Sequence, residues 1–408
     1  MSQFSGFIDE IEWISVDSFL PENTQKCTAY FLSHCHADHM RGLNDLPFST
    51  HIASKADHFV YCSEVSAQIV RNMMRDNESL LGKLKPLSLG PNWVQVPIIN
   101  SDYHLNLVVT LIPAGHCLGS CMFLFETEKT TVLYTGDFRF CVNDYPKITL
   151  LHDSSGGVKE LDTVYLDTTF WTQANHHFPS RHESLALITT EIDKFRKRTA
   201  NHGHIHIDKP ARIGSEFFIM ELSQRYKRKI HVSDDSLRIY EGIHEVSSCI
   251  TKNTKETFLH MCQSYRPGRA KRRLPCVEDY LQVLHIRPTA QWYSVGGEFF
   301  PVREDCDRNI IQISNSMHAS RAELVEFVKY FKPRRAVACV VPVNSSMDEV
   351  QNELDEILSE CCGRRLRKRR WSSSTEGSPT RKFVPRPPFL IPTTTAPGFG
   401  EELDYEEN

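Results

Sequence analysis

The chain has 408 residues, of which 40% are hydrophobic and 24% charged, and its formal net charge is −4 at pH 7. This length and apolar content allow two or three domains with buried cores and exclude a wholly disordered chain. Thirteen cysteines, with no secretory signal and no apolar run long enough to cross a bilayer, predict a reducing intracellular setting and no membrane partner.

The first predicted strand, Ala29–Leu32, leads into a loop with an unusual density of metal-binding side chains. Five of them fall within six residues of sequence: His34, Cys35, His36, Asp38 and His39. Imidazole and carboxylate groups suit zinc or manganese, and carboxylate with water suits magnesium. A His-rich polar loop without metal is the alternative, but no ordinary structural need explains three imidazoles and an aspartate in the pattern HxHxDH. We expect Cys35 to be a packing group.

Two later segments add the groups that this loop lacks. In LIPAGHCLGS, at 111–120, His116 lies between two glycines and precedes a predicted strand, Cys121–Phe125. A further predicted strand, Thr131–Tyr134, runs into TGDFRF and leaves Asp137 at its end. A lone histidine or a strand-end aspartate is more often structural. Together with the first loop, however, the two segments complete a ligand set.

These segments resemble the metal motifs of the metallo-β-lactamase superfamily, and Asp17 in ISVDSF matches the aspartate that begins its motif series. The resemblance implies two ligand sets bridged by Asp137. The first consists of His34, His36 and His116, and the second consists of Asp38 and His39. It implies catalytic Zn²⁺, with Mg²⁺ or Mn²⁺ as the alternative at the second position. Two such ions can activate water near neutral pH and neutralise the charge that builds on an attacked phosphorus or carbonyl. Asp17 is expected to orient a ligand histidine rather than to touch metal.

The region after Asp137 narrows the substrate class. A predicted strand in VYLDTTF, ending at Asp167, and PSRHES before a long amphipathic stretch resemble the nucleic-acid-processing branch, which carries an inserted β-CASP domain. The branch implies that His318, in SNSMHASRAEL, contacts the scissile phosphate or protonates the leaving oxygen. RNA-processing members carry histidine at a third position, which falls here in VVPVNSS at Val343, whereas DNA-processing members carry valine. The resemblance therefore implies a DNA enzyme with these catalytic residues: Asp17, Asp38, Asp137, Asp167 and His318.

Four residues of the insertion match the structural zinc site of the Artemis-type DNA nucleases in this branch: His231, His260, Cys262 and Cys276. Two histidines and two cysteines make a closed tetrahedral site, which indicates a structural rather than a catalytic ion. The Apollo-type exonucleases lack this quartet. Unrelated surface histidines and buried thiols are the alternative. A second His-rich run, His202–Asp208, alternates like a strand, and we assign it no metal because no matching cluster appears near it.

Candidate substrate contacts are spread over several segments. Ser320, in HASRAE at 318–323, and Arg181, in PSRHES, are expected to bind substrate. Relatives read HSSYSE at 318–323, and the loss of two hydroxyls leaves the preference for a 5′-phosphate end open. Basic runs at Lys194–Arg198 and Arg266–Arg273 are candidate contacts for the DNA backbone. A solvated helix face explains the first run equally well.

The C-terminal stretch differs in composition from the rest of the chain. A basic block, Arg364–Arg370 (RRLRKRR), is of the kind read by nuclear import receptors, or it is the solvated end of the predicted helix Met347–Leu358. Residues 371–408 are rich in Ser, Thr, Pro and charge, and are predicted to be disordered. We expect a nuclear protein whose tail is a candidate docking segment for a repair-protein partner.

The resemblance implies an α/β fold: a four-layer αβ/βα metallo-β-lactamase fold from residues 1–158 and 308–362, an α/β β-CASP insertion at 159–307, and a tail at 363–408. It implies a metal-dependent DNA nuclease that hydrolyses phosphodiester bonds in hairpins, overhangs and single-strand ends, as an Artemis-like endonuclease in double-strand-break repair by non-homologous end joining. The alternatives are an Apollo-like 5′–3′ exonuclease in crosslink repair or telomere maintenance, an RNA endonuclease, a small-molecule hydrolase and a non-catalytic scaffold.

Overall fold

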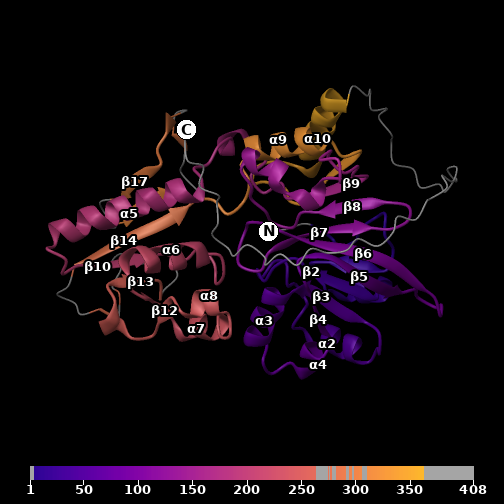
Figure 1. Cartoon of the computed structure of the whole chain (residues 1–408), viewed down its shortest axis with the longest axis horizontal. Helices are drawn as coiled ribbons and strands as arrows, with labels where there is room; N and C mark the ends of the chain where they lie inside the picture. The colour runs from indigo at the N-terminus through magenta and orange to yellow at the C-terminus, as the bar shows by residue number, and fades with distance from the viewer. Residues whose placement is uncertain are drawn as a thin grey trace. The chain divides into compact units, whose positions relative to one another are not determined.

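In the computed structural model, the described residues are 4–262, 274, 276–277, 282–290, 294–295, 298–305 and 310–362. They belong to one compact unit, Met1–Arg365, which contains two lobes built around separate sheets (Figure 1). The basic run Arg266–Arg273, the import block and the expected docking segment lie outside the described residues. Among the described helices, none is both long and apolar enough to cross a membrane.

The first lobe holds two sheets. One has the strand order β1-β2-β3-β4, with all neighbours parallel, and consists of β1 (Ile14–Val16), β2 (Ala29–Leu32), β3 (Phe59–Ser63) and β4 (Leu84–Leu87). The other has the order β19-β9-β8-β7-β6-β5, and consists of β19 (Arg335–Ala338), β9 (Thr163–Leu166), β8 (Thr131–Tyr134), β7 (Cys121–Glu126), β6 (His104–Pro113) and β5 (Gly90–Pro97). The predicted strands in this lobe are confirmed, β2 and β8 to the residue.

The core between these two sheets is rich in aromatic rings. The ring of Phe31 in β2 lies 5.1 Å from that of Tyr61 in β3 and 5.0 Å from that of Phe125 in β7. Each such pair contributes roughly 0.5–1.5 kcal/mol beyond the area it buries. Because β2 and β8 are buried along almost their whole length, they read in the sequence as continuous apolar runs rather than as alternating ones. The sheets therefore hold the ends of these two strands at fixed places, where the metal motifs follow.

Helices cover the outer face of each sheet, as Figure 1 shows. On the β1–β4 sheet lie α2 (Leu46–Ala53), α3 (Glu64–Met73) and α4 (Glu78–Leu81), and α1 (Pro21–Lys26) contacts α2. On the other sheet lie α9 (Arg321–Phe331), α10 (Met347–Cys362) and two 3₁₀ turns, η1 (Val142–Lys147) and η2 (Thr149–Leu151). This helix–sheet–sheet–helix arrangement confirms the four-layer fold that the sequence predicts.

The second lobe is built on one largely parallel sheet. Its strand order is β12-β11-β13-β10-β14-β18-β17, and only β17 is antiparallel to its neighbour among the described strands. The strands are β12 (Ile250–Thr251), β11 (Ile230–His231), β13 (Leu259–His260), β10 (His204–Ile207), β14 (Val283–Thr289), β18 (Ile310–Ser314) and β17 (Val302–Asp305). The smaller elements are α7 (Asp234–Ile239), α8 (His244–Ser247), η3 (Gln173–Asn175), η4 (Thr254–Glu256), β15 (Ser294–Val295) and β16 (Glu298–Phe299). The longer helices are α5 (Arg181–Arg198) and α6 (Glu216–Tyr226).

Helix α5 is the long amphipathic stretch that the sequence predicts after PSRHES. It begins with a capping box, in which the Ser180 hydroxyl accepts from the Glu183 N–H and the Glu183 carboxylate accepts from the Ser180 N–H. The basic run Lys194–Arg198 forms its last turns, where positive charge complements the helix dipole. That position supports the solvated-helix interpretation of the run.

The sheets place the ends of the insertion at residues other than the predicted boundaries, 158/159 and 307/308. β9 pairs with β8 and β19, so the strand that ends before Asp167 belongs to the first lobe. At the other end, β18 pairs with β14 over five residues, so Ile310–Ser314 belongs to the second lobe. The insertion therefore starts after β9 and ends at β18. The sequence gives no sign of this shift, because a buried strand has the same composition in either sheet.

A buried guanidinium joins the two lobes. Arg139, in the loop after β8, donates to the backbone carbonyls of Phe178 at 3.2 Å and Pro179 at 2.9 Å, just before α5. It donates to the carbonyl of Ser316 at 2.8 Å, just after β18. Its guanidinium also lies 3.3 Å from the Glu323 carboxylate in α9. Arg139 therefore contacts both segments in which the chain passes from one lobe to the other.

Replacing Arg139 should destabilise the fold far more than replacing an exposed arginine. Arg139→Met leaves three carbonyls and the Glu323 carboxylate without their buried donor, and should lower the free energy of unfolding by about 3–5 kcal/mol. Urea unfolding measures the change. Arg334→Met removes surface ion pairs with Glu160 and Asp162 and should cost about 1 kcal/mol or less. Equal losses in the two variants would contradict the role given to Arg139.

Candidate metal centre

Three loops of the first lobe bring metal-binding side chains to one point. His34 and His36 follow β2, His116 lies between β6 and β7, and Asp137 follows β8. One ligand atom from each of the four lies within 4.8 Å of the others, and all but the half-buried His36 are buried. The structure thus brings together the first ligand set and the bridging aspartate expected from the sequence.

Backbone carbonyls hold two of these histidines in place. His36 Nε2 donates to the carbonyl of Ile213 at 3.0 Å, and His116 Nδ1 donates to the carbonyl of Met317 at 2.9 Å. Ile213 lies between β10 and α6, and Met317 follows β18, so both carbonyls come from the second lobe or its return. These bonds fix the tautomers and leave His36 Nδ1 and His116 Nε2 to face the metal position. The sequence cannot reveal such partners, because every residue type carries a carbonyl.

Asp17 is the hydrogen-bond hub of the other side of the centre. Its carboxylate accepts from the Ser33 N–H at 2.7 Å, the Ser33 hydroxyl, the Tyr134 hydroxyl at 2.9 Å and His39 Nδ1 at 2.7 Å. The Ser33 hydroxyl also lies 3.0 Å from His34 Nδ1. Asp17 thus holds His39 in place, and Asp17, His34 and His39 also form a group whose ligand atoms lie within 4.8 Å of one another. Ser33 and Tyr134, which lie one residue before a motif, are partners that the sequence analysis missed.

The atoms that face Asp137 fit divalent ions. His34 Nε2 and His39 Nε2 are buried and have no hydrogen-bond partner among the described residues. Asp137 Oδ2 lies 3.5 Å from His34 Nε2 and 3.6 Å from His116 Nε2, and Oδ1 lies 3.3 Å from His39 Nε2. Two ligand atoms at about 2.1 Å from one tetrahedral ion lie roughly 3.4 Å apart. Oδ2 of Asp137 thus faces His34 and His116, and Oδ1 faces His39, at distances suited to a bridge between two ions.

The protonation states favour ligand binding as well. Burial lowers the pKa of His34, and it lowers the pKa of His36 to about 4 and that of His116 well below its usual value. Burial alone would raise the pKa of Asp137, but His39 and His318 lower it well below the usual value for a carboxyl. At neutral pH the three histidines are therefore neutral and the aspartate is ionised, which are the forms that bind metal.

A second group at the same centre consists of Asp137, Asp167 and His318. His318 Nδ1 lies 2.9 Å from Asp167 Oδ2, and its Nε2 lies 3.9 Å from Asp137 Oδ2. The ring of Phe170 lies 5.7 Å from the His318 ring, edge to face. Burial alone would lower the pKa of His318, but Asp137 and Asp167 raise it to about 9. The two residues expected from the β-CASP motifs thus adjoin the bridging aspartate.

Asp38 is the expected ligand that the structure does not gather into a cluster. It lies half-buried in the turn between His36 and His39, and it belongs to none of the metal-binding groups found among the described residues. Its place in the motif therefore remains the ground for a ligand role.

Val343, the residue expected to separate DNA from RNA enzymes, does not lie beside Asp167, and the valine that follows β19 near Asp167 is Val340. β19 pairs with β9 so that Ala338 lies beside Leu166, and the next residues along these strands are Cys339 and Asp167. Val340 follows at 6% exposure. Val343 is 86% exposed, so it does not line a buried site. Both Val340 and Val343 are valine, so the residue type expected for a DNA enzyme is the same at the two positions.

Arg181 and Ser320 serve the fold where the sequence analysis expected substrate contacts. Arg181 donates to the carbonyls of Gly115 and His116, and thereby fixes the backbone of the His116 loop. Ser320 is fully buried, and its hydroxyl accepts from the Glu323 N–H as the N-cap of α9. The sequence signal, Ser three residues before Glu, was that of a capping box.

The expected zinc quartet is assembled in the second lobe. His231 in β11 and His260 in β13 lie on neighbouring strands, with their Nδ1 atoms 3.1 Å apart. Cys276 Sγ lies 3.5 Å from His260 Nδ1 and 3.5 Å from Cys262 Sγ. Ligands of a tetrahedral zinc ion with bonds of about 2.0–2.3 Å lie roughly 3.3–3.8 Å apart. The four side chains therefore fit one structural zinc ion.

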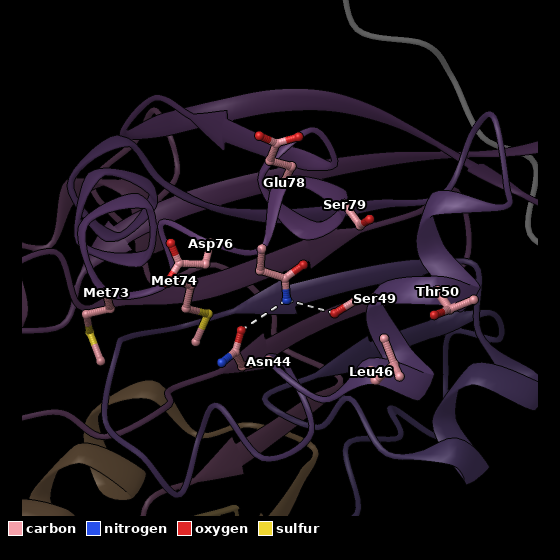
Figure 2. Close-up of a pocket in the computed structure, with 10 residues that line it drawn as sticks. Asn44, Leu46, Ser49, Thr50, Met73, Met74, Asp76, Glu78 and Ser79 are labelled. Atoms are coloured by element: carbon pink, nitrogen blue, oxygen red, sulfur yellow. Dashed lines mark hydrogen bonds between the residues drawn. The ribbon is translucent and has the colours of Figure 1, made fainter.

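A pocket of about 510 Å³ lies elsewhere in the first lobe, beside α2 and α4 (Figure 2). Its lining residues are Asn44, Leu46, Ser49, Thr50, Met73, Met74, Asp76, Asn77, Glu78 and Ser79. The Asn77 amide donates to Asn44 Oδ1 at 3.0 Å and to the Ser49 hydroxyl at 2.8 Å, as the dashed lines of Figure 2 mark. Because no histidine or cysteine lines this pocket, it offers no comparable ligand set.

Comparisons with known proteins agree with this geometry. Residues 16–213 match the family model of a beta-lactamase superfamily domain, and residues 244–344 match that of the DNA repair metallo-beta-lactamases. Protein artemis of Homo sapiens is 31% identical over 99% of this chain and 56% of its own length. Protein artemis of Danio rerio is 31% identical over 93% of this chain and 61% of its own length. The DNA cross-link repair 1A protein of Homo sapiens is 28% identical over 80% of this chain and 29% of its own length.

The chain spans about half the length of the artemis proteins that it matches. The two matched family regions fall in both lobes, and the first contains the three loops that gather His34, His116 and Asp137.

Ser320→Ala should act on stability through loss of the helix cap. We expect the free energy of unfolding to fall by about 1 kcal/mol, measured by urea unfolding. Ser180→Ala is the matched variant, because α5 begins with the same capping box. Unchanged stability in Ser320→Ala would contradict the capping role.

Proposed function

Because the chain belongs to the metallo-β-lactamase superfamily and to its DNA-repair branch, we propose that it is a metal-dependent nuclease that hydrolyses phosphodiester bonds in DNA. The observation that carries this proposal is the placement of Asp137. Its two oxygens face separate histidine groups, and it adjoins the pair formed by Asp167 and His318. Hydrolysis of a small molecule requires only the metal-binding histidines, whereas the Asp167–His318 pair is suited to give a proton to the sugar oxygen that leaves the phosphate.

The side chains of the centre have separate proposed roles. His34, His36 and His116 would hold Zn²⁺, and His39 with Asp38 would hold a second Zn²⁺, Mg²⁺ or Mn²⁺, with Asp137 shared. Such ions supply Lewis acidity at the scissile phosphate and activate water for attack. Asp17 keeps His39 in the orientation in which its Nε2 faces Asp137. His34, His36 and His116 are neutral and Asp137 is ionised at neutral pH, because burial lowers the pKa of the three histidines and nearby histidines lower that of the carboxyl. Burial alone would also lower the pKa of His39, but Asp137 and Asp17 raise it well above its usual value, so His39 would have to release a proton to bind an ion.

His318 is proposed as the group that serves the leaving oxygen. Its Nδ1 is held by Asp167, so its Nε2 is the atom directed toward Asp137. Asp167, which accepts from Nδ1, favours the protonated form of the His318 ring, whose other proton lies on Nε2. Transfer of that proton to the departing 3′-oxygen would leave a 3′-hydroxyl and a 5′-phosphate.

The substrate class within DNA is proposed from the second lobe. The quartet of His231, His260, Cys262 and Cys276 favours an Artemis-like endonuclease, which opens hairpins and trims overhangs and single-strand ends in non-homologous end joining. An Apollo-like 5′–3′ exonuclease is the second candidate, and valine at position 340 disfavours an RNA enzyme. Nuclear localisation rests on the basic block 364–370 and on the repair relatives, and the tail is proposed to dock a repair protein.

Asp137→Asn should abolish DNA cleavage while the protein stays folded. Loss of the shared carboxylate should lower the cleavage rate by about a hundredfold or more, since even partners outside a metal's ligand shell are worth ten- to a hundredfold. The assay compares end-labelled hairpin DNA, 5′-phosphorylated single-stranded DNA and matching RNA with Mg²⁺ or Mn²⁺. Cuts near the hairpin tip support the endonuclease, and a ladder from the 5′ end supports the exonuclease.

The matched control for this test is Asp102→Asn, which changes an exposed carboxylate in the loop between β5 and β6. It should cleave at the unaltered rate. An Asp137→Asn variant as active as Asp102→Asn would refute the metal centre as the catalytic site. Cleavage of RNA alone would refute the DNA assignment.

Cys276→Ser should release the structural ion. One thiolate of the quartet is lost, so we expect about one zinc less per chain by elemental analysis and a loss of several kcal/mol of stability, a fraction of the roughly 10–16 kcal/mol of binding energy measured for structural zinc in small domains. Cys249→Ser, at a half-buried thiol outside the quartet, is the control. Zinc content equal to that of the control would contradict the quartet.

A further inference from the structure

We propose that His204 is a positioning residue of the zinc quartet, which accepts a hydrogen bond from His260 and commits His260 to bind zinc through Nδ1. His204 Nδ1 lies 2.9 Å from His260 Nε2, on the side of the ring opposite to the quartet. This inference rests on the zinc site proposed above at His231, His260, Cys262 and Cys276. It concerns the run His202–Asp208, to which the sequence analysis assigned no metal.

The sheet places His204 where it can reach His260. β10 and β13 are parallel neighbours, with Ile205 beside Leu259 and His206 beside His260. Side chains two residues apart on a strand share a face, so His204 and His206 both project toward the face that carries His260. The two imidazole rings lie 5.1 Å apart between centroids and 43° apart in plane. The contact is therefore fixed by strand register.

The chemistry of His260 requires an acceptor at this place. Its Nδ1 is the atom near His231 Nδ1 and Cys276 Sγ, so zinc would take the lone pair of Nδ1 and the ring proton would reside on Nε2. The side chain is fully buried, so water does not reach that N–H. A buried donor without a partner is costly. The lone pair of His204 Nδ1 satisfies it and excludes the other tautomer of His260.

An imidazole also suits the charge of this site. Metal-bound histidines commonly donate to a carboxylate, a carbonyl or water. Two thiolates already balance the two charges of zinc, so a carboxylate behind His260 would make a buried site negative. A neutral imidazole orients the ligand and leaves the balance unchanged. The neighbouring His206 has a different partner, the ring of His285 at 3.3 Å between Nδ1 atoms, and does not share this role.

The test is metal affinity at the quartet of the full chain. Cobalt substituted for zinc reports this site separately from the catalytic centre, because among the metal-binding groups of the described residues the quartet alone contains cysteines, whose charge transfer to cobalt absorbs in the near ultraviolet. Zinc displaces the cobalt, and a competing chelator sets the free zinc concentration. His204→Leu removes the acceptor at similar volume, and should weaken zinc binding about ten- to a hundredfold while one ion still binds at saturation.

Two further variants separate orientation from packing. His204→Gln keeps an acceptor oxygen and should hold zinc within a few-fold of the unaltered chain, and the exposed His202→Leu, in the same run, should hold it unchanged. Unaltered affinity in His204→Leu would overturn this inference alone. Equal weakening in the Leu and Gln variants would also overturn it, because packing rather than the hydrogen bond would then be responsible. Absence of the thiolate absorption in the unaltered chain would instead refute the quartet itself.

Discussion

The buried carboxylate of Asp17 is the interaction on which the metal centre depends. A buried charge is tolerated only when donors surround it, and Asp17 receives four, from the backbone and hydroxyl of Ser33, from Tyr134 and from His39. Those donors stand at the ends of β2 and β8 and in the metal loop, so one carboxylate fixes the relative positions of all three. Asp17 itself has a left-handed backbone with φ of 55°, a conformation that the surrounding bonds must stabilise.

The second lobe takes part in the metal centre through its backbone. Its carbonyls at Ile213 and Met317 fix the tautomers of His36 and His116. Gly214, next to Ile213, has φ of 115°, and a Cβ there would lie 2.6 Å from the Met317 sulfur, so glycine lets these two segments approach. The proposed zinc quartet would stabilise the same lobe from within its sheet. Ligand geometry in one lobe is therefore set partly by the folding of the other.

The sequence predicts what short, local patterns encode. The metal loops at His34, His116 and Asp137 are predicted, together with the strands before the first and the last and the strand after His116, because ligand chemistry and buried strands both leave dense local signals. The lobe boundary at β18 is not predicted, since sheet membership depends on distant partners. Ser320 was misassigned because a hydroxyl beside a catalytic histidine suggests substrate, whereas the Ser–Glu spacing that makes it a helix cap carries the correct signal. The contact of His204 with His260 depends on strand register, which no local pattern reveals.

The carbonyls behind His36 and His116 bear on how a substrate gains access. A hinge motion that parted the lobes would pull both carbonyls away and free two ligand rings at once, and the Arg139 contacts to Pro179 and Ser316 would resist it as well. These contacts therefore favour a fixed arrangement of the two lobes at the metal centre over one that opens and closes. A nucleic-acid substrate would then have to bend, fray or unpair to reach the metal centre. The free-energy cost of that distortion would determine which substrates are cleaved in preference.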